Sequence, residues 1–126
     1  MKNLENWKCT PGVDHHDWGV QSIVHMSALF GVAVLRLLTG AALPPRRHLH
    51  NMRDYVVTCG EVTMHRLTST ADLLAQGATT DAEAQTVTLQ TGQKLTVPAG
   101  WEYQLEAGPH GADLLEIVWH NPLTFD

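Results

Sequence analysis

The chain has 126 residues, 44% of them hydrophobic, and a formal net charge of −5 with histidine neutral, which suits one domain with a sizeable core and excludes a disordered chain. Its eight lysines and arginines are scattered except for Arg46 and Arg47, so we expect no nucleic-acid partner. Its longest apolar stretch, residues 26–38, is interrupted by Ser27 and Arg36 and is too short to cross a bilayer, so we expect no membrane partner. Two cysteines are too few for a disulfide framework, which favours a cytoplasmic location.

Short runs of β-favouring residues, separated by turn residues, follow one another along the chain. They cover residues 20–25, 32–38, 55–66, 86–89, 94–97, 101–106 and 114–119, and a turn-like Cys59-Gly60 interrupts the third run. Many short strands at close spacing predict an antiparallel sandwich or small barrel. The exception is residues 70–84, which predict a short helical excursion between strands. We predict one domain over residues 1–126, with its barrel core at about 17–120.

The segment after Gly100 alternates between hydrophobic and polar residues over residues 101–106. On a strand, this alternation places one set of side chains in the core and the other set in water. Trp101 and Tyr103 belong to the hydrophobic set. We therefore predict that both point into the interior of the barrel.

Two histidines, His48 and His50, stand one residue apart just before a β-rich run. Side chains at positions i and i+2 of a strand face the same way, so the two imidazoles would project together from one strand. Neighbouring imidazoles suit a metal site or an acid/base pair. A solvated or purely structural pair is the alternative. If the site holds metal, His65 on a neighbouring strand is a candidate third imidazole.

These features together resemble the cupins. A cupin's first motif has His-x-His, a short spacer, an acidic residue and a turn glycine, which is similar to His48, His50 and Gly60. The second motif has Gly, five residues, Pro-x-Gly, two residues and His, and the chain matches its glycine and proline spacing from Gly92 to Gly100. The resemblance implies a double-stranded β-helix, a barrel of the jelly-roll type, and a homodimer that pairs through an edge strand.

Within the cupins, the chain is most similar to the C-terminal domain of type II mannose-6-phosphate isomerase/GDP-mannose pyrophosphorylase. The residues HDWG at 16–19 resemble that family's Arg-Pro-Trp-Gly entry, and LLEI at 114–117 resembles its late Leu-Ile-Glu-Val strand. This narrower resemblance implies an enzyme that acts on a sugar or sugar phosphate.

The departures from the cupin pattern affect the metal site. Cupin metal centres usually take three histidines and one carboxylate, but Arg53 stands at the glutamate position and Tyr103 at the third histidine position. The resemblance therefore implies only His48 and His50 as ligands of a divalent ion, Zn, Mn, Fe or Ni. Asp54 could replace the glutamate, because alternation from His48 places it inward. A neutral tyrosine, with its pKa near ~10, is a weak ligand.

The first functional hypothesis is a metal-dependent isomerase or epimerase, in which the ion polarises a carbonyl while Tyr103 or Asp54 moves a proton. Arg47 and Arg53, or Arg46, would hold an anionic end of the small-molecule substrate, and Trp101 would line its binding wall. Arginines at strand edges are more often solvated, and a buried tyrosine is more often structural. The alternatives are a non-catalytic cupin that binds a ligand or metal, and an iron-dependent dioxygenase.

Overall fold

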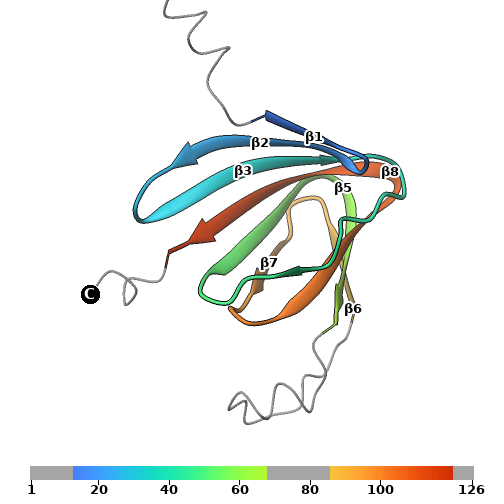
Figure 1. The fold of residues 1–126 in the computed structure, drawn as a ribbon. Coiled ribbons are helices and arrows are strands. Elements are labelled where there is room, and N and C mark those ends of the chain that lie inside the picture. The colour runs from blue at the N-terminus through green and yellow to red at the C-terminus, as the bar shows by residue number, and fades with distance from the viewer. Residues whose placement is uncertain (1–12, 68–85, 121–126) are drawn as a thin grey trace, which may run out of the picture.

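The computed structural model describes residues 13–67 and 86–120, and this part of the chain consists of strands, turns and loops (Figure 1). The strands are β1 (Val13–His16), β2 (Gly19–Met26), β3 (Phe30–Leu37), β4 (Arg46–Arg47), β5 (Met52–Arg66), β6 (Thr86–Gln90), β7 (Lys94–Val97) and β8 (Glu102–Trp119). The predicted all-β class is confirmed. The helical excursion predicted for residues 70–84 lies outside the described residues. Within the described ranges, no helix could span a membrane.

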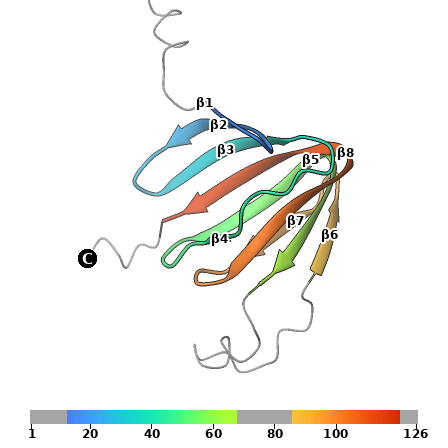
Figure 2. The same ribbon diagram turned by 45° about the vertical axis from the view of Figure 1, so that its right-hand side comes forward.

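All strand pairs are antiparallel, in the order β1-β2-β3-β8-β5-β6, with β4 also beside β8 and β7 beside β5. The long strands β5 and β8 pair with different neighbours along their two halves. Figures 1 and 2 show both strands curving, so that the sheet folds into two facing layers. Strand β1 ends the strand order, and a homodimer joined at an edge strand stays a prediction.

The bend in β5 lies at Gly60, where the sequence predicted a turn. Instead of turning, β5 continues from Met52 to Arg66, and its register against β8 shifts on both sides of Gly60. Gly60 has φ +85°, and a Cβ at this position would lie 2.4 Å from the carbonyl oxygen of Gly111. Glycines and bulges of this kind let one strand pass from one layer to another. Gly60 is therefore a corner of the barrel.

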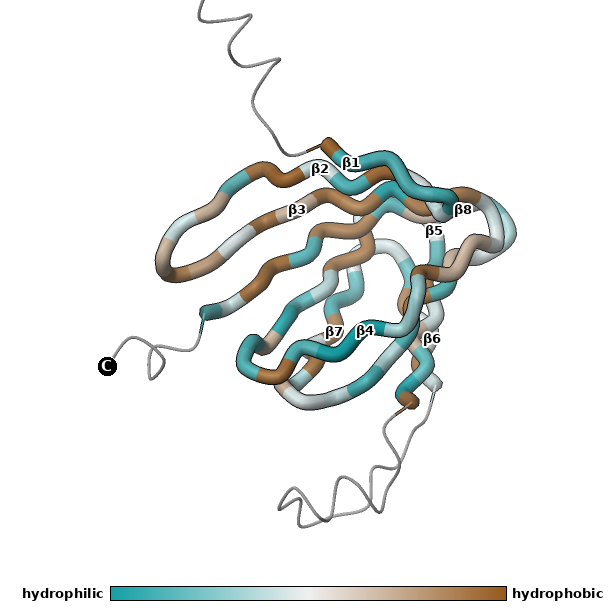
Figure 3. Tube along the Cα trace, viewed as in Figure 1, coloured by the Kyte–Doolittle hydropathy of each residue, from teal (hydrophilic) through white to brown (hydrophobic). Residues whose placement is uncertain are grey.

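The core fills the space between the two layers. Tyr103 and Leu105 are fully buried, whereas Glu102, Gln104 and Glu106 on the same strand are not, so the predicted alternation is confirmed. Figure 3 shows hydrophobic residues along β3 and hydrophilic residues at β4. The interior is not purely apolar, because Glu116 is also buried, with 1% of its surface exposed. This buried carboxylate marks the candidate site.

Candidate functional site

Glu116 lies at the centre of a buried cluster of charged and hydroxyl groups. Arg46 Nη1 donates a hydrogen bond to Glu116 Oε2, and Arg53 Nη1 lies 3.1 Å from Oε1. The Tyr55 hydroxyl donates to Oε2 at 2.6 Å. Strands β4 and β5 supply these donors and β8 supplies the carboxylate, because Tyr55 and Glu116 are direct partners in the register of β5 and β8. The carboxylate therefore has two hydrogen-bond donors and a second guanidinium as an ion-pair partner, which compensate for its loss of water.

Two tyrosines extend this cluster into the core. Arg46 Nη1 donates to the Tyr55 hydroxyl at 3.0 Å, and the hydroxyl groups of Tyr55 and Tyr103 are hydrogen-bonded to each other. Because Tyr55 has a single hydroxyl proton, which goes to Glu116, Tyr103 must be the donor to Tyr55. Burial raises the pKa of Tyr55 and that of Tyr103 above the ordinary value of a tyrosine. Both phenols are therefore neutral donors at physiological pH.

The charges of the cluster do not cancel. Burial alone would raise the pKa of the Glu116 carboxyl, but Arg46, the Tyr55 hydroxyl and Arg53 outweigh burial and lower the pKa below its ordinary value. The carboxylate is therefore ionised at neutral pH. Two guanidinium groups face this one carboxylate, which leaves one net positive charge in a largely water-excluded place.

His48 lies beside this positive charge, in the connection between β4 and β5. Its ring centroid is 5.9 Å from that of Tyr103, and its buried Nε2 has no hydrogen-bond partner among the described residues. Burial lowers the pKa of His48 to about 4, with further lowering from Arg53 and Arg46. His48 is therefore a neutral imidazole at pH 7, and it carries one unused polar atom.

The shift in His48 predicts a loss of stability in mild acid. Between pH 6.5 and about 4 the unfolded chain binds a proton at this residue that the folded protein excludes, so stability falls as the pH drops through this range. We expect urea unfolding to show a loss of about 1–2 kcal/mol from pH 7.5 to pH 5, after allowing for partial solvent screening, and the variant His48→Gln to lack it. His110→Gln, at an exposed histidine of β8, is the control. Equal pH dependence in the wild type and His48→Gln would contradict the assignment.

His50 does not join His48. The prediction that both histidines project from one strand is wrong, because neither lies in a strand and His50 is exposed. Their segment is the connection between β4 and β5, where the alternation of a strand does not apply. The proposed third imidazole, His65, instead pairs with Glu106 at 3.1 Å and faces Thr86.

The groups around His48 do not fit a divalent ion. Its positively charged neighbours are the guanidinium groups of Arg46 and Arg53, which repel a cation. Both oxygens of the Glu116 carboxylate are already engaged by the cluster, Oε2 through hydrogen bonds and Oε1 through the ion pair with Arg53. Over residues 13–67 and 86–120, no group of three or more His, Cys, Asp or Glu side chains could hold a metal ion. A metal at His48 and His50 stays a prediction from the sequence, and we derive no chemistry from it.

Asp54 faces away from the cluster. It is buried on the opposite side of β5 from Arg53 and Tyr55, where it accepts hydrogen bonds from Thr96 Oγ1 and, at 2.8 Å, from Trp119 Nε1. The alternation that placed Asp54 inward started from His48, and the connection before β5 breaks it. The structure does not bring Asp54 to Tyr103, so the two candidate proton-transfer residues lie on different faces of the sheet.

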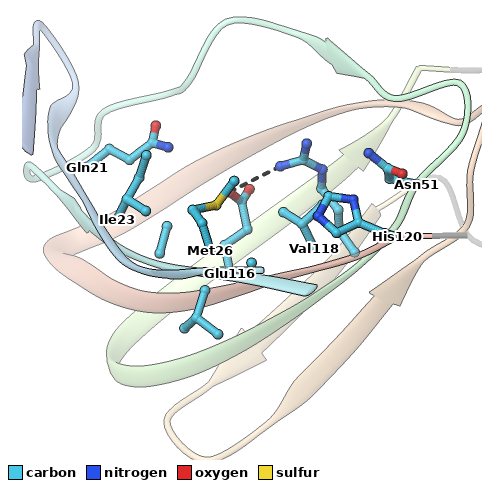
Figure 4. Close-up of a pocket in the computed structure, with 11 residues that line it drawn as sticks. Gln21, Ile23, Met26, Asn51, Glu116, Val118 and His120 are labelled. Carbon is cyan, nitrogen blue, oxygen red and sulfur yellow. Dashed lines mark ion pairs between the residues drawn. The ribbon is translucent and has the colours of Figure 1, made fainter. Parts of the chain in front are cut away.

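The three predicted substrate-binding residues lie apart. Arg47 is exposed on β4, and Trp101 is half-buried against the core with the Arg66 guanidinium 5.6 Å from its ring centroid. Arg53 alone of the three lines a pocket of about 300 Å³ that also reaches Glu116. Asn51 and His120 lie near this charged end, and Gln21 with mostly hydrophobic residues of β2, β3 and β8 forms the remaining wall (Figure 4).

Sequence reasoning missed Tyr55 and Glu116 as site residues. Glu116 carried a usable signal, because it is an acidic residue within the apolar run from Leu114 to Trp119 and shares the parity of Leu114. Such a position faces the core and requires a buried partner. Its partners could not be identified, because Arg46 lies 70 positions away along the chain.

Solved structures match this fold, whereas no family model and no curated protein matches the chain. The cupin domain of Schizosaccharomyces pombe Cnp3 has a TM-score of 0.65 and 14% identity, covering 93% of this chain and 74% of that one. KdgF from a Halomonas species has a TM-score of 0.67 and 12% identity, with 90% of each chain covered. An RmlC-like cupin from Shewanella frigidimarina has a TM-score of 0.65 and 14% identity, covering 93% and 90%. The chain therefore has the cupin fold, and the similarity to the mannose-6-phosphate isomerase domain stays a prediction.

Proposed function

We propose that this protein binds a small organic anion in the pocket beside Arg53, without a metal ion. The observation that carries the proposal is the position of Arg53, which lines the pocket and pairs with Glu116 through Nη1. A guanidinium presents several donors in a plane and pairs readily with carboxylates. An entering anion would pair with the part of the Arg53 guanidinium that lines the pocket.

The electrostatics of the cluster support an anion over a cation or a neutral ligand. The cluster carries one net positive charge, and after burial the two arginines are the main cause of the low pKa of His48. The positive field that opposes protonation of the His48 imidazole also opposes the binding of a metal cation there. The same field favours a negative charge at the end of the pocket where Arg53 and Glu116 lie.

The arrangement favours binding over proton-transfer catalysis. Tyr103, the predicted acid, is 0% exposed and its hydroxyl is bonded to that of Tyr55, so a ligand in the pocket does not meet it. His48, with a pKa of about 4, is a weak base at neutral pH. The metal-dependent isomerase and the iron dioxygenase would both need an ion among guanidinium groups. The non-catalytic ligand-binding cupin is therefore the function we propose.

Calorimetric titration of matched anions and neutral analogues tests this function. The probes are acetate, hexanoate and inorganic phosphate, with acetamide and hexanamide as uncharged counterparts. We expect at least one anion to bind while its neutral analogue does not, and Arg53→Gln to weaken that binding about tenfold or more, since a charge-assisted hydrogen bond contributes roughly 1.5–3 kcal/mol.

Arg36→Gln is the control for this titration, because Arg36 is an exposed arginine that pairs with Asp113 outside the pocket. Arg53→Lys keeps the charge that Glu116 requires and tests whether the planar guanidinium matters. Circular dichroism checks that each variant is folded. Unchanged anion binding in folded Arg53→Gln, or equal binding of the neutral amides, would contradict the proposal.

A further inference from the structure

The pocket beside Arg53 is charged at one end and apolar over most of the remaining wall. Its apolar residues come from three neighbouring strands, and they are Ile23, Met26, Val32, Ala33 and Val118. Figure 4 shows Met26 and Val118 on either side of Glu116 in that view. A ligand that contacts only the charged end would leave this apolar wall in water.

A bulge in β2 builds the apolar wall. Ile23 pairs with Ala33 and Met26 pairs with Gly31, and the register shift between Ile23 and His25 makes this possible. Without the extra residue, His25 and not Met26 would share the inward face with Ile23. Gly31 gives the thioether room, because a Cβ at Gly31 would lie 2.9 Å from Met26 Sδ.

The apolar wall continues to the protein surface. Met26 is 64% exposed and Ile23 is 40% exposed, although both side chains line the pocket. Large exposed apolar side chains at the edge of a pocket are typical of ligand-binding surfaces. A ligand with an apolar body would cover both residues while its charged group reaches Arg53.

The polar groups limit the ligand class further. One net positive charge suits a monoanion better than a phosphate dianion. Beyond Arg53 and Glu116, the polar side chains of the lining are Gln21, Asn51 and His120, which is a small number for the hydroxyl groups of a sugar. The single net charge, the few polar side chains and the apolar wall therefore favour a single carboxylate on an apolar body.

We propose that the ligand is an amphipathic monocarboxylate, with its carboxylate at Arg53 and its apolar body along Val118 and Met26 toward the surface. This inference rests on the anion-binding function proposed above and names the class of anion. Each methylene group buried along the wall raises the affinity about fourfold, so affinity increases with chain length until the tail passes Met26.

Calorimetry with acetate, butyrate, hexanoate and octanoate, and with inorganic phosphate, tests the inference on the full chain. We expect hexanoate to bind at least about tenfold more tightly than acetate or phosphate. Met26→Gln should weaken hexanoate binding about fourfold or more and leave acetate binding unchanged. Leu29→Gln is the matched control, because Leu29 is 70% exposed near the same hairpin and does not line the pocket.

The two proposals fail in different ways. If acetate or phosphate binds as tightly as hexanoate and Arg53→Gln removes that binding, the protein binds anions but the amphipathic class is overturned. If Met26→Gln leaves hexanoate binding unchanged, the path of the apolar body is also overturned. If no probe binds, or if binding does not depend on Arg53, both proposals fall.

Discussion

Replacing Glu116 with glutamine is expected to lower the free energy of unfolding by about 3–5 kcal/mol. The substitution keeps the shape of the side chain but leaves the guanidinium groups of Arg46 and Arg53 without their counterion in a buried place. It also replaces the charged acceptor of the Tyr55 hydroxyl. Urea unfolding followed by circular dichroism at pH 7.5 measures the difference.

Asp113→Asn is the control for this measurement, because Asp113 also pairs with an arginine but the Arg36 side chain is 72% exposed. An exposed ion pair contributes at most about 1 kcal/mol, so the control should differ little from the wild type. A loss in Glu116→Gln as small as that of the control would mean that the cluster is not held together by the Glu116 charge.

Replacing Gly60 with alanine is expected to lower the free energy of unfolding by about 3–4 kcal/mol, the sum of backbone strain and steric overlap. Gly60 has φ +85°, and the added Cβ would meet the backbone at Gly111 O (2.4 Å) and Ala112 Cα (3.0 Å). These atoms belong to the backbone of β8, which pairs with β5 at this point, so they cannot move without distorting the corner between the two layers.

Gly92→Ala separates the two causes. Gly92 has φ +90°, but nothing lies within 4 Å of a Cβ at this position. We expect this variant to lose only about 1–2 kcal/mol, from backbone strain alone. Equal losses in Gly60→Ala and Gly92→Ala would show that the close approach of β5 and β8 is not what requires glycine at the corner.

Most strands could be predicted from local patterns, because alternation and turn residues act over a few positions. β1 and β4 were not predicted, and the runs at 101–106 and 114–119 form the single strand β8. The hydrophobic alternation over residues 101–106 placed Tyr103 in the core correctly, and Gly92 and Gly100, which stand between predicted strands, lie in turns. Gly60 has the special conformation that its position suggested, yet it forms a bulge within β5. A positive φ can serve a turn or a corner equally well, and only the pairing of β5 with β8 distinguishes them.

The site was harder to predict, because its geometry depends on a connection and on distant pairs. Four residues of non-strand backbone, from His48 to Asn51, precede β5, so counting alternate positions from His48 gave the wrong face for Asp54. Arg53 was recognised as a departure from the metal motif. Its ion pair with Glu116 could not be foreseen, since it depends on the register of β5 against β8.

Elemental analysis of the purified protein, expressed in medium supplemented with Zn, Mn, Fe and Ni, tests most directly whether a positively charged cluster occupies the centre of this cupin fold. Because Arg46 and Arg53 would repel a cation at His48, we predict a metal content far below one ion per chain. A stoichiometric ion in the wild type that is lost in the double variant His48→Ala and His50→Ala would contradict this account.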